Sequence, residues 1–198
     1  MTSHRAAGAA VLRERVTETI ARAAFDELAE TGYARLSMEA VTRRAGVGKA
    51  ALYRRWPSKD AMLIDLVSTA VREHSPADID TGSLRGDVEA FIRDVVGVLT
   101  HELVSRIVPD LFAEAARNRD LADALREAVA TPRRAAAAQL LQRAVDRGEL
   151  PAHLDYELGM DLLGAPLFFR LLITRGSVDN GYVARLTNAT MAALAAAE

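Results

Sequence analysis

The sequence contains no cysteine, few aromatic residues and no long hydrophobic run. Without cysteine it has no disulfide, thiolate nucleophile or cysteine-ligated metal cluster, and we expect a cytoplasmic protein. No apolar stretch approaches the roughly eighteen residues that span a membrane, and the N-terminus lacks an apolar leader, so we expect neither insertion nor export. Of the 198 residues, 50% are hydrophobic, 26% charged and 5% aromatic, which indicates a globular protein.

Catalytic and metal-binding patterns are also missing. The four histidines are scattered, and no pair has the spacing of metal ligands. No Gly-x-Ser-x-Gly nucleophile motif occurs. Gly46–Ala51 matches the Gly-x-Gly-x-x-Ala pattern of dinucleotide loops, but those loops follow a strand and this segment follows a predicted helix. We therefore expect no metal, no cofactor and no enzyme.

Apolar residues recur at helical spacing along almost the whole chain, and strand alternation is absent. The pattern predicts a helix over 9–31 that stops at Gly32, and a short helix between an N-cap at Ser37 and a glycine end at Gly46. Further helices are predicted at 49–56, 58–74, 84–104, 105–118, 119–147, 155–174 and 179–197. The fold class is therefore all-α with about nine helices.

Residues 75–83 are turn formers and mark a domain boundary. We expect an N-terminal arm and a first, three-helix domain over 1–57, a connecting helix and linker over 58–83, and a second α-helical domain over 84–198.

Positive charge is concentrated in one segment of this sequence, whose net charge is −2. Between Arg35 and Asp60 there are seven lysines and arginines against two acidic residues. A short basic segment on an otherwise acidic protein indicates a local anionic partner, although a solvated basic surface is the alternative.

The segment Ser37–Asp60 has the composition of a helix-turn-helix: a short helix, a glycine turn and a second short helix. In such a unit the second helix enters the DNA major groove. Lys49, Arg54 and Arg55 suit phosphates and guanine edges, or they are ordinary solvent-facing residues. Trp56 is expected in the core. Lys59 lies at a helix N-terminus, where a cation is unfavourable unless a phosphate binds there too.

The stretch from Phe25 to Leu63 resembles the DNA-binding domain of TetR-family transcriptional regulators. The residues that carry the resemblance are Phe25, Gly32-Tyr33, Val41, Ala45-Gly46-Val47, Leu52-Tyr53, Trp56, Ser58-Lys59 and Leu63. The sequence departs from the family pattern with Thr42 for alanine, Gly48 for serine or threonine, Arg55 for histidine or tyrosine, and Trp56 for phenylalanine. Gly48 removes a hydroxyl that relatives offer to phosphate.

The resemblance implies a homodimer that binds a palindromic double-stranded DNA operator as a repressor and is released by a small-molecule effector. It also implies that 1–57 holds the N-terminal arm and the DNA-binding domain, and that 84–198 is a domain for ligand binding and dimerisation. Its DNA-facing positions map to Ser37, Lys49, Ala51, Tyr53, Arg54 and Lys59. We add Arg44 and Arg55 on charge. An all-α protein-interaction module without DNA binding is the alternative function, and a small all-α enzyme is a second one.

The last two predicted helices are apolar on more than one face, which suits a helix buried between its own domain and a second copy. Expected dimer residues are Leu158, Leu162, Leu167, Leu171, Val183, Leu186 and Met191; central core helices are the alternative. Expected ligand-binding residues are Phe91, Val95, Leu99, His101, Phe112, Met160, Phe168 and Arg170, with plain core packing as the alternative for each.

Overall fold

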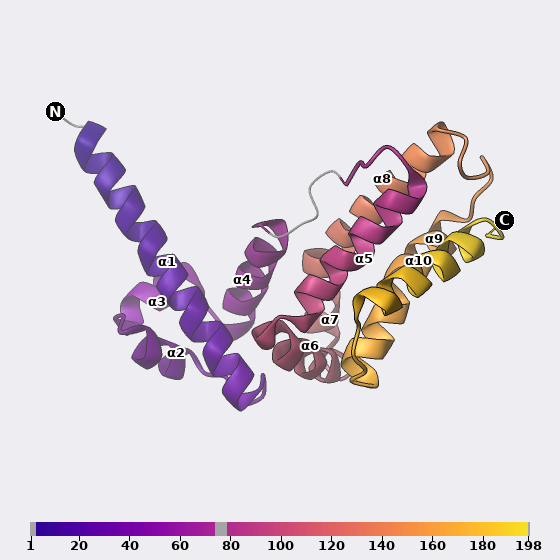
Figure 1. Ribbon diagram of the computed structural model, residues 1–198. Helices are drawn as coiled ribbons and strands as arrows, with labels where there is room; N and C mark the ends of the chain where they lie inside the picture. The colour runs from indigo at the N-terminus through magenta and orange to yellow at the C-terminus, as the bar shows by residue number, and fades with distance from the viewer. Residues whose placement is uncertain (1–2, 74–78, 198) are drawn as a thin grey trace. The chain divides into compact units, whose positions relative to one another are not determined.

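The computed structural model describes residues 3–73 and 79–197, with side chains from residue 15 onward, and within these ranges it contains helices and no strand. Figure 1 shows the helices in chain order. They are α1 (Ser3–Thr31), α2 (Met38–Ala45), α3 (Lys49–Arg55), α4 (Lys59–Glu73), α5 (Leu84–Thr100), α6 (Glu102–Ala115), α7 (Arg119–Leu125), α8 (Thr131–Asp146), α9 (Tyr156–Phe168) and α10 (Asn180–Leu194). The predicted all-α fold class is confirmed.

Two π-helical segments continue α-helices without a break. The segment η1 (Arg126–Ala130) connects α7 to α8, and η2 (Phe169–Ile173) continues α9. Pro132 follows η1 and has no N–H to donate to the carbonyl four residues earlier, so the helix departs from regular α geometry there. Counted as continuous segments, the described residues form nine helices, as the sequence predicts.

Some predicted boundaries are wrong. The first helix begins at Ser3 rather than at residue 9. The break that we expect after residue 104 lies at His101, whose extended backbone (φ −60°, ψ 132°) ends α5 before α6 begins at Glu102. Periodicity misses this break because apolar residues resume at Leu103, directly after the polar residues Thr100, His101 and Glu102. The proposed domain boundary at 75–83 stays a prediction, since residues 74–78 lie outside the described part.

The chain divides into two compact units. The first comprises residues up to Thr69 together with Arg106–Leu125, and the second comprises Ala70–Ser105 together with the residues from Arg126 onward. The core of the first unit draws on α1, α2, α3 and α4. Its most deeply buried side chains include Ala24, Leu28, Val41, Leu52, Met62 and Leu63.

Within the first unit, α6 is bonded to the end of α1. The Arg106 guanidinium donates to the Ala29 carbonyl oxygen at 3.0 Å, in the last turn of α1. The Asp110 carboxylate accepts the Tyr33 N–H at 2.6 Å. Gly32 turns the chain between them with a φ of +78°, and a Cβ there would lie 3.2 Å from Asp110 Oδ1. The Arg106 cation therefore lies at the C-terminus of α1, where a positive charge is favourable, and the Asp110 carboxylate binds the N–H of Tyr33 just beyond it.

In the second unit, α5 packs against α9 and α10, and α8 packs against α9. Asp87 of α5 is fully buried and accepts hydrogen bonds from Thr81 and from Arg147 Nη2, the latter at 2.9 Å. Glu149 accepts the Leu84 N–H at 2.7 Å and so caps α5. Arg147 and Glu149 thus hold the start of α5 in place.

Across residues 3–73 and 79–197, no helix combines the length and apolar character needed to cross a membrane. In the same ranges, no three histidine, cysteine or acidic side chains gather closely enough to hold a metal ion.

Candidate nucleic-acid interface

Helices α2 and α3 form the helix-turn-helix that the sequence predicts. Ser37 Oγ accepts the Ala40 N–H at 3.1 Å and caps α2. Gly46 ends α2 in the left-handed conformation (φ +66°), which glycine adopts without strain. The chain then re-enters a helix at Lys49, where Gly48 is the N-cap and provides no side-chain hydrogen bond.

The inner side of this motif is closely packed. Val41 of α2 and Leu52 of α3 are completely buried, and Trp56 is only 3% exposed. The Trp56 indole N–H donates to Asp65 of α4 at 2.9 Å. The prediction that Trp56 belongs to the core is confirmed. These contacts fix α3 against the rest of the unit and leave its opposite face in solvent.

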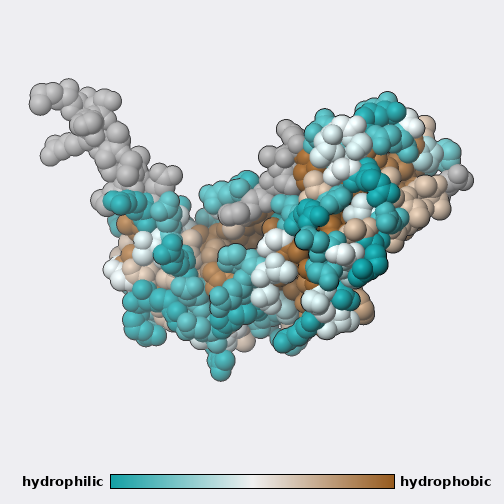
Figure 2. Space-filling model, in the orientation of Figure 1, coloured by the Kyte–Doolittle hydropathy of each residue, from teal (hydrophilic) through white to brown (hydrophobic). Residues whose placement is uncertain are grey.

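The solvent-facing side of α3 carries Lys49, Tyr53 and Arg54, all exposed. Tyr53 is 39% exposed, which is high for an aromatic residue. The Lys49 ammonium lies 5.5 Å from the centre of the Tyr53 ring, one turn along the helix. The visible surface around α2 is mainly hydrophilic, and the surface around α3 mixes hydrophilic and hydrophobic residues (Figure 2). We name Lys49, Tyr53 and Arg54 the α3 face.

Glu39 is the residue near this face that sequence reasoning misses. It lies in the first turn of α2, 2.7 Å from the Lys49 ammonium, and accepts the Tyr53 hydroxyl at 3.2 Å. The hydrogen bond from Lys49 lowers the pKa of the Glu39 carboxyl below its usual value. In the sequence, Glu39 is one of two acidic residues in a basic segment. Its contact with Lys49 cannot be predicted there, because helical spacing relates residues within one helix and not residues of α2 and α3 across the turn.

Two arginines proposed on charge point toward α1 rather than away from the motif. Arg44 forms ion pairs with Glu27, at 3.0 Å, and with Glu30. The hydrogen bond from Arg44 lowers the pKa of Glu30. Arg55 donates to the Thr17 hydroxyl and its guanidinium lies 4.8 Å from the centre of the Trp56 ring. Both cations are thus already engaged within the unit.

Lys59, Ala51 and Ser37 are less exposed than the α3 face. The Lys59 ammonium donates to the Tyr33 carbonyl oxygen at 2.9 Å, and the residue is half-buried at the first turn of α4. Ala51 is half-buried, and Ser37 is half-buried as the cap of α2. Of the eight predicted DNA-binding residues, Lys49, Tyr53 and Arg54 therefore form one exposed group.

Two family profiles together cover most of the chain. One, described as "Bacterial regulatory proteins, tetR family", matches residues 20–66, which include α2 and α3. The other, described as "Tetracyclin repressor-like, C-terminal domain", matches residues 78–190. The chain belongs to the TetR family of transcriptional regulators.

Individual relatives agree with this assignment. The uncharacterized HTH-type transcriptional regulator YdeS of Bacillus subtilis is 32% identical over 84% of this chain and 83% of its own. The DNA-binding transcriptional repressor TetR of Mycobacteroides abscessus is 32% identical over 83% of this chain and 86% of its own. Among solved structures, the TetR-family regulator SCO0332 is 34% identical, with a TM-score of 0.70, covering 89% of this chain and 97% of that one.

The predicted ligand-binding residues of this TetR-family protein are spread over different environments. Phe91, Val95 and Leu99 lie in the core of the second unit, and Met160 and Phe168 pack against that core. The other three residues lie outside this core. His101 is exposed, Arg170 donates to the Ser177 carbonyl at 2.8 Å, and Phe112 belongs to the first unit, where it is 58% exposed.

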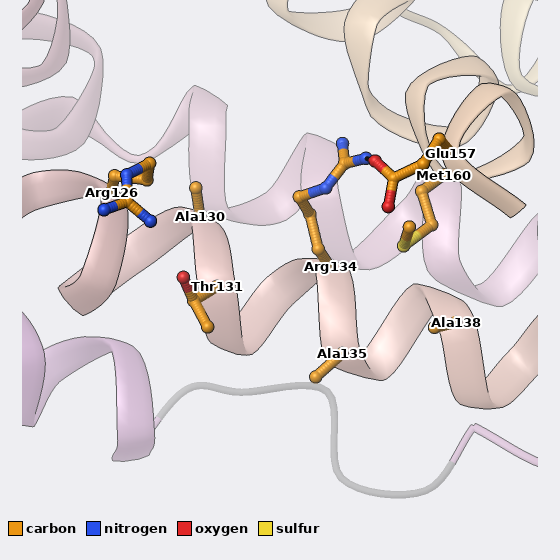
Figure 3. Close-up of a pocket in the computed structure, with 8 residues that line it drawn as sticks. All are labelled: Arg126, Ala130, Thr131, Arg134, Ala135, Ala138, Glu157 and Met160. Carbon is orange, nitrogen blue, oxygen red and sulfur yellow. Dashed lines mark hydrogen bonds and ion pairs between the residues drawn. The ribbon is translucent and has the colours of Figure 1, made fainter. Parts of the chain in front are cut away.

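The second unit instead has an open hollow of about 440 Å³ between α8 and α9 (Figure 3). Arg134 reaches across it from α8 and pairs with Glu157 and Asp161 of α9. Met160 is the one predicted ligand residue that lines it. The full lining is Arg126, Ala130, Thr131, Arg134, Ala135, Ala138, Glu157 and Met160.

The predicted dimer residues also separate by burial. Leu167 and Val183 are buried in the chain's own core, so neither offers a surface to a second copy. Leu162, Leu171, Leu186 and Met191 are half-buried against the same core. Leu158 is 46% exposed, and two residues outside the prediction are more exposed still: Phe169 at 62% and Ile173 at 70%.

Proposed function

We propose that this TetR-family regulator is a repressor that binds a palindromic operator as a homodimer and is released by a small-molecule effector. The observation that carries the proposal is the α3 face: Lys49, Tyr53 and Arg54 are exposed together on a helix whose other side is anchored by the buried Leu52. A short helix whose buried side is anchored and whose exposed side is cationic suits insertion into a major groove.

Each residue of the α3 face has a chemical role in this proposal. Lys49 and Arg54 supply charged donors for phosphates and for the O6 and N7 atoms of guanine. Tyr53 donates its hydroxyl to a phosphate. Ser37, Ala51 and Lys59 would also meet the duplex. Arg44 and Arg55 would have to leave their partners on α1 to join them.

The proposed dimer rests on exposed apolar side chains of α9 and η2. Leu158 and Phe169 are separated by about three helical turns, and Ile173 follows one turn later, so the three side chains form a stripe. Water is a poor environment for such a stripe, and a second copy packed through the same face would cover it. Dimerisation would set the two α3 faces about one turn of DNA apart, or slightly more.

Release by an effector requires only a modest energetic coupling. A tenfold loss of operator affinity corresponds to about 1.4 kcal/mol between the two sites. We propose that the effector binds within the second unit, where the hollow between α8 and α9 and the side chains of Met160 and Phe168 offer mixed apolar and charged contacts.

Selection of bound duplexes from a random pool tests the DNA-binding proposal. We expect enrichment of a two-fold symmetric sequence. A matched pool presented to a variant with Lys49→Ala and Arg54→Ala should give no enrichment. If the natural chain enriches no sequence and shifts no duplex, the proposal is wrong and the protein-interaction alternative takes its place.

A further inference from the structure

Glu39 binds donors of the α3 face. Its Oε1 atom lies 2.7 Å from the Lys49 ammonium and accepts the Tyr53 hydroxyl at 3.2 Å. One carboxylate on α2 thus binds two of the three side chains on the face. Arg54 is exposed beside them.

The carboxylate occupies these donors in the way that a phosphate would. A phosphate oxygen is also an anionic acceptor and forms the same charge-assisted bonds with an ammonium and a hydroxyl. The side chains of Glu39 and Lys49 are 54% and 63% exposed, so their ion pair lies in water. Exposed ion pairs are weak, and a duplex that approaches the face can displace this one.

We propose that Glu39 is an internal competitor of the DNA phosphates, which holds Lys49 and Tyr53 in the free protein and lowers the affinity of the α3 face for duplexes of any sequence. The inference rests on the proposed DNA binding and adds a residue that limits its strength. Non-specific binding is almost entirely electrostatic, so the effect is measured most cleanly on DNA that offers no sequence-specific contact.

The test measures the affinity of the full chain for a duplex of scrambled sequence at low salt. Glu39→Gln keeps the size of the side chain and removes its charge. We expect tighter binding by a factor of about 1.4 to 5, the range that corresponds to an exposed ion pair, and a gain that shrinks as salt is raised.

A second background separates competition from simple charge repulsion. In a Lys49→Met chain the main partner of Glu39 is absent, so Glu39→Gln should increase affinity clearly less than in the natural chain. Glu102→Gln makes the same charge change at an exposed position in the other compact unit and should give a smaller gain than Glu39→Gln. Thermal unfolding of each variant checks that the loss of an acid from the first turn of α2 has not unfolded the domain.

The outcomes distinguish this inference from the proposed function. If the natural chain binds no duplex, the proposed function is wrong. If it binds, but Glu39→Gln binds equally or more weakly, Glu39 is not a competitor. An equal gain with and without Lys49, or an equal gain for Glu102→Gln, also overturns the inference, because the effect would then be one of net charge.

Discussion

The Lys59 ammonium donates a hydrogen bond of 2.9 Å to the Tyr33 carbonyl oxygen and lies 4.3 Å from the centre of the Tyr33 ring. The Tyr33 hydroxyl in turn donates to Asp60 at 2.6 Å. Burial, together with the hydrogen bond to Asp60, raises the pKa of this tyrosine well above its usual value, so the hydroxyl stays protonated. Lys59 is therefore held in place before any DNA arrives.

This arrangement allows Lys59 both to stabilise the fold through Tyr33 and to bind a DNA phosphate, and one variant can separate the two roles. An ammonium has three donors, and one is used by Tyr33, which leaves others for a phosphate. We expect Lys59→Ala to lower the affinity for DNA of every sequence and to reduce the salt slope by about 0.9 for each phosphate that the protein no longer neutralises. A filter-binding titration over several salt concentrations measures the slope. A variant that is less stable to urea but keeps the natural slope would show that Lys59 is structural only.

Gly32 combines a left-handed backbone with a crowded site. Gly32→Ala would place a Cβ 3.2 Å from Asp110 Oδ1, and that carboxylate is held by the Tyr33 N–H. Gly46 has a similar φ (+66°) and nothing within 4 Å of the added Cβ. Both substitutions should cost about 1–2 kcal/mol for the left-handed backbone.

The Gly32 variant should lose additional stability because the Asp110 carboxylate must move. Urea unfolding of the two alanine variants measures the difference, with Gly46→Ala as the control for backbone strain. Equal losses at the two positions would mean that the bond between Asp110 and Tyr33 contributes little.

Asp87 is predicted to make stability depend on pH. Burial acts to raise the pKa of its carboxyl, but hydrogen bonds from Thr81 and Arg147 outweigh burial and lower it below the usual 3.8. A lowered folded-state pKa stabilises the fold above the unfolded value, and this contribution is lost as the pH falls through the folded value.

Asp87→Asn should therefore reduce the free energy of unfolding by about 1–3 kcal/mol near neutral pH. The gap between the two proteins should narrow as the pH falls below about 4. Asp80→Asn is the matched control: Asp80 also pairs with Arg147, at 3.5 Å, but is 55% exposed, so its loss should matter less. A gap that is constant with pH would rule out an ionised, stabilising Asp87.

The exposed apolar stripe of Leu158, Phe169 and Ile173 on α9 and η2 predicts that the protein is a dimer. Phe169→Glu together with Ile173→Glu places two like charges where a second copy would pack, so we expect a folded monomer with much weaker operator binding. Sedimentation equilibrium measures the mass, and circular dichroism confirms the helical content. Ala113→Glu, an exposed position on α6, should leave the mass unchanged. A natural chain that is already monomeric would contradict the dimer proposal.

Much of the helix-turn-helix is predictable from the sequence because local chemistry determines it. Ser37 and Gly46 mark the ends of α2 through a side-chain cap and a left-handed backbone, and both signals need only neighbouring residues. Trp56 is also predicted correctly as core. By contrast, the break at His101 has no glycine or proline to mark it, and the helical pattern continues on both sides.

The contacts that the sequence does not predict are those between elements. Glu39 contacts Lys49 across a turn, and Arg44 pairs with Glu27 and Glu30 on α1. No periodic spacing in the sequence predicts either contact. The burial of the apolar residues of α9 and η2 is likewise not predictable from the sequence. The sequence of α9 and η2 is apolar on more than one face, and only packing reveals that Leu167 is buried while Phe169 is exposed.

The most direct test of the central claim is a crystal structure of the chain bound to a duplex selected from the random pool. The account predicts two copies, each with α3 in a major groove and with Lys49, Tyr53 and Arg54 on phosphates or base edges, about one helical turn apart. A complex in which α3 lies away from the DNA, with another element in the groove, would contradict it.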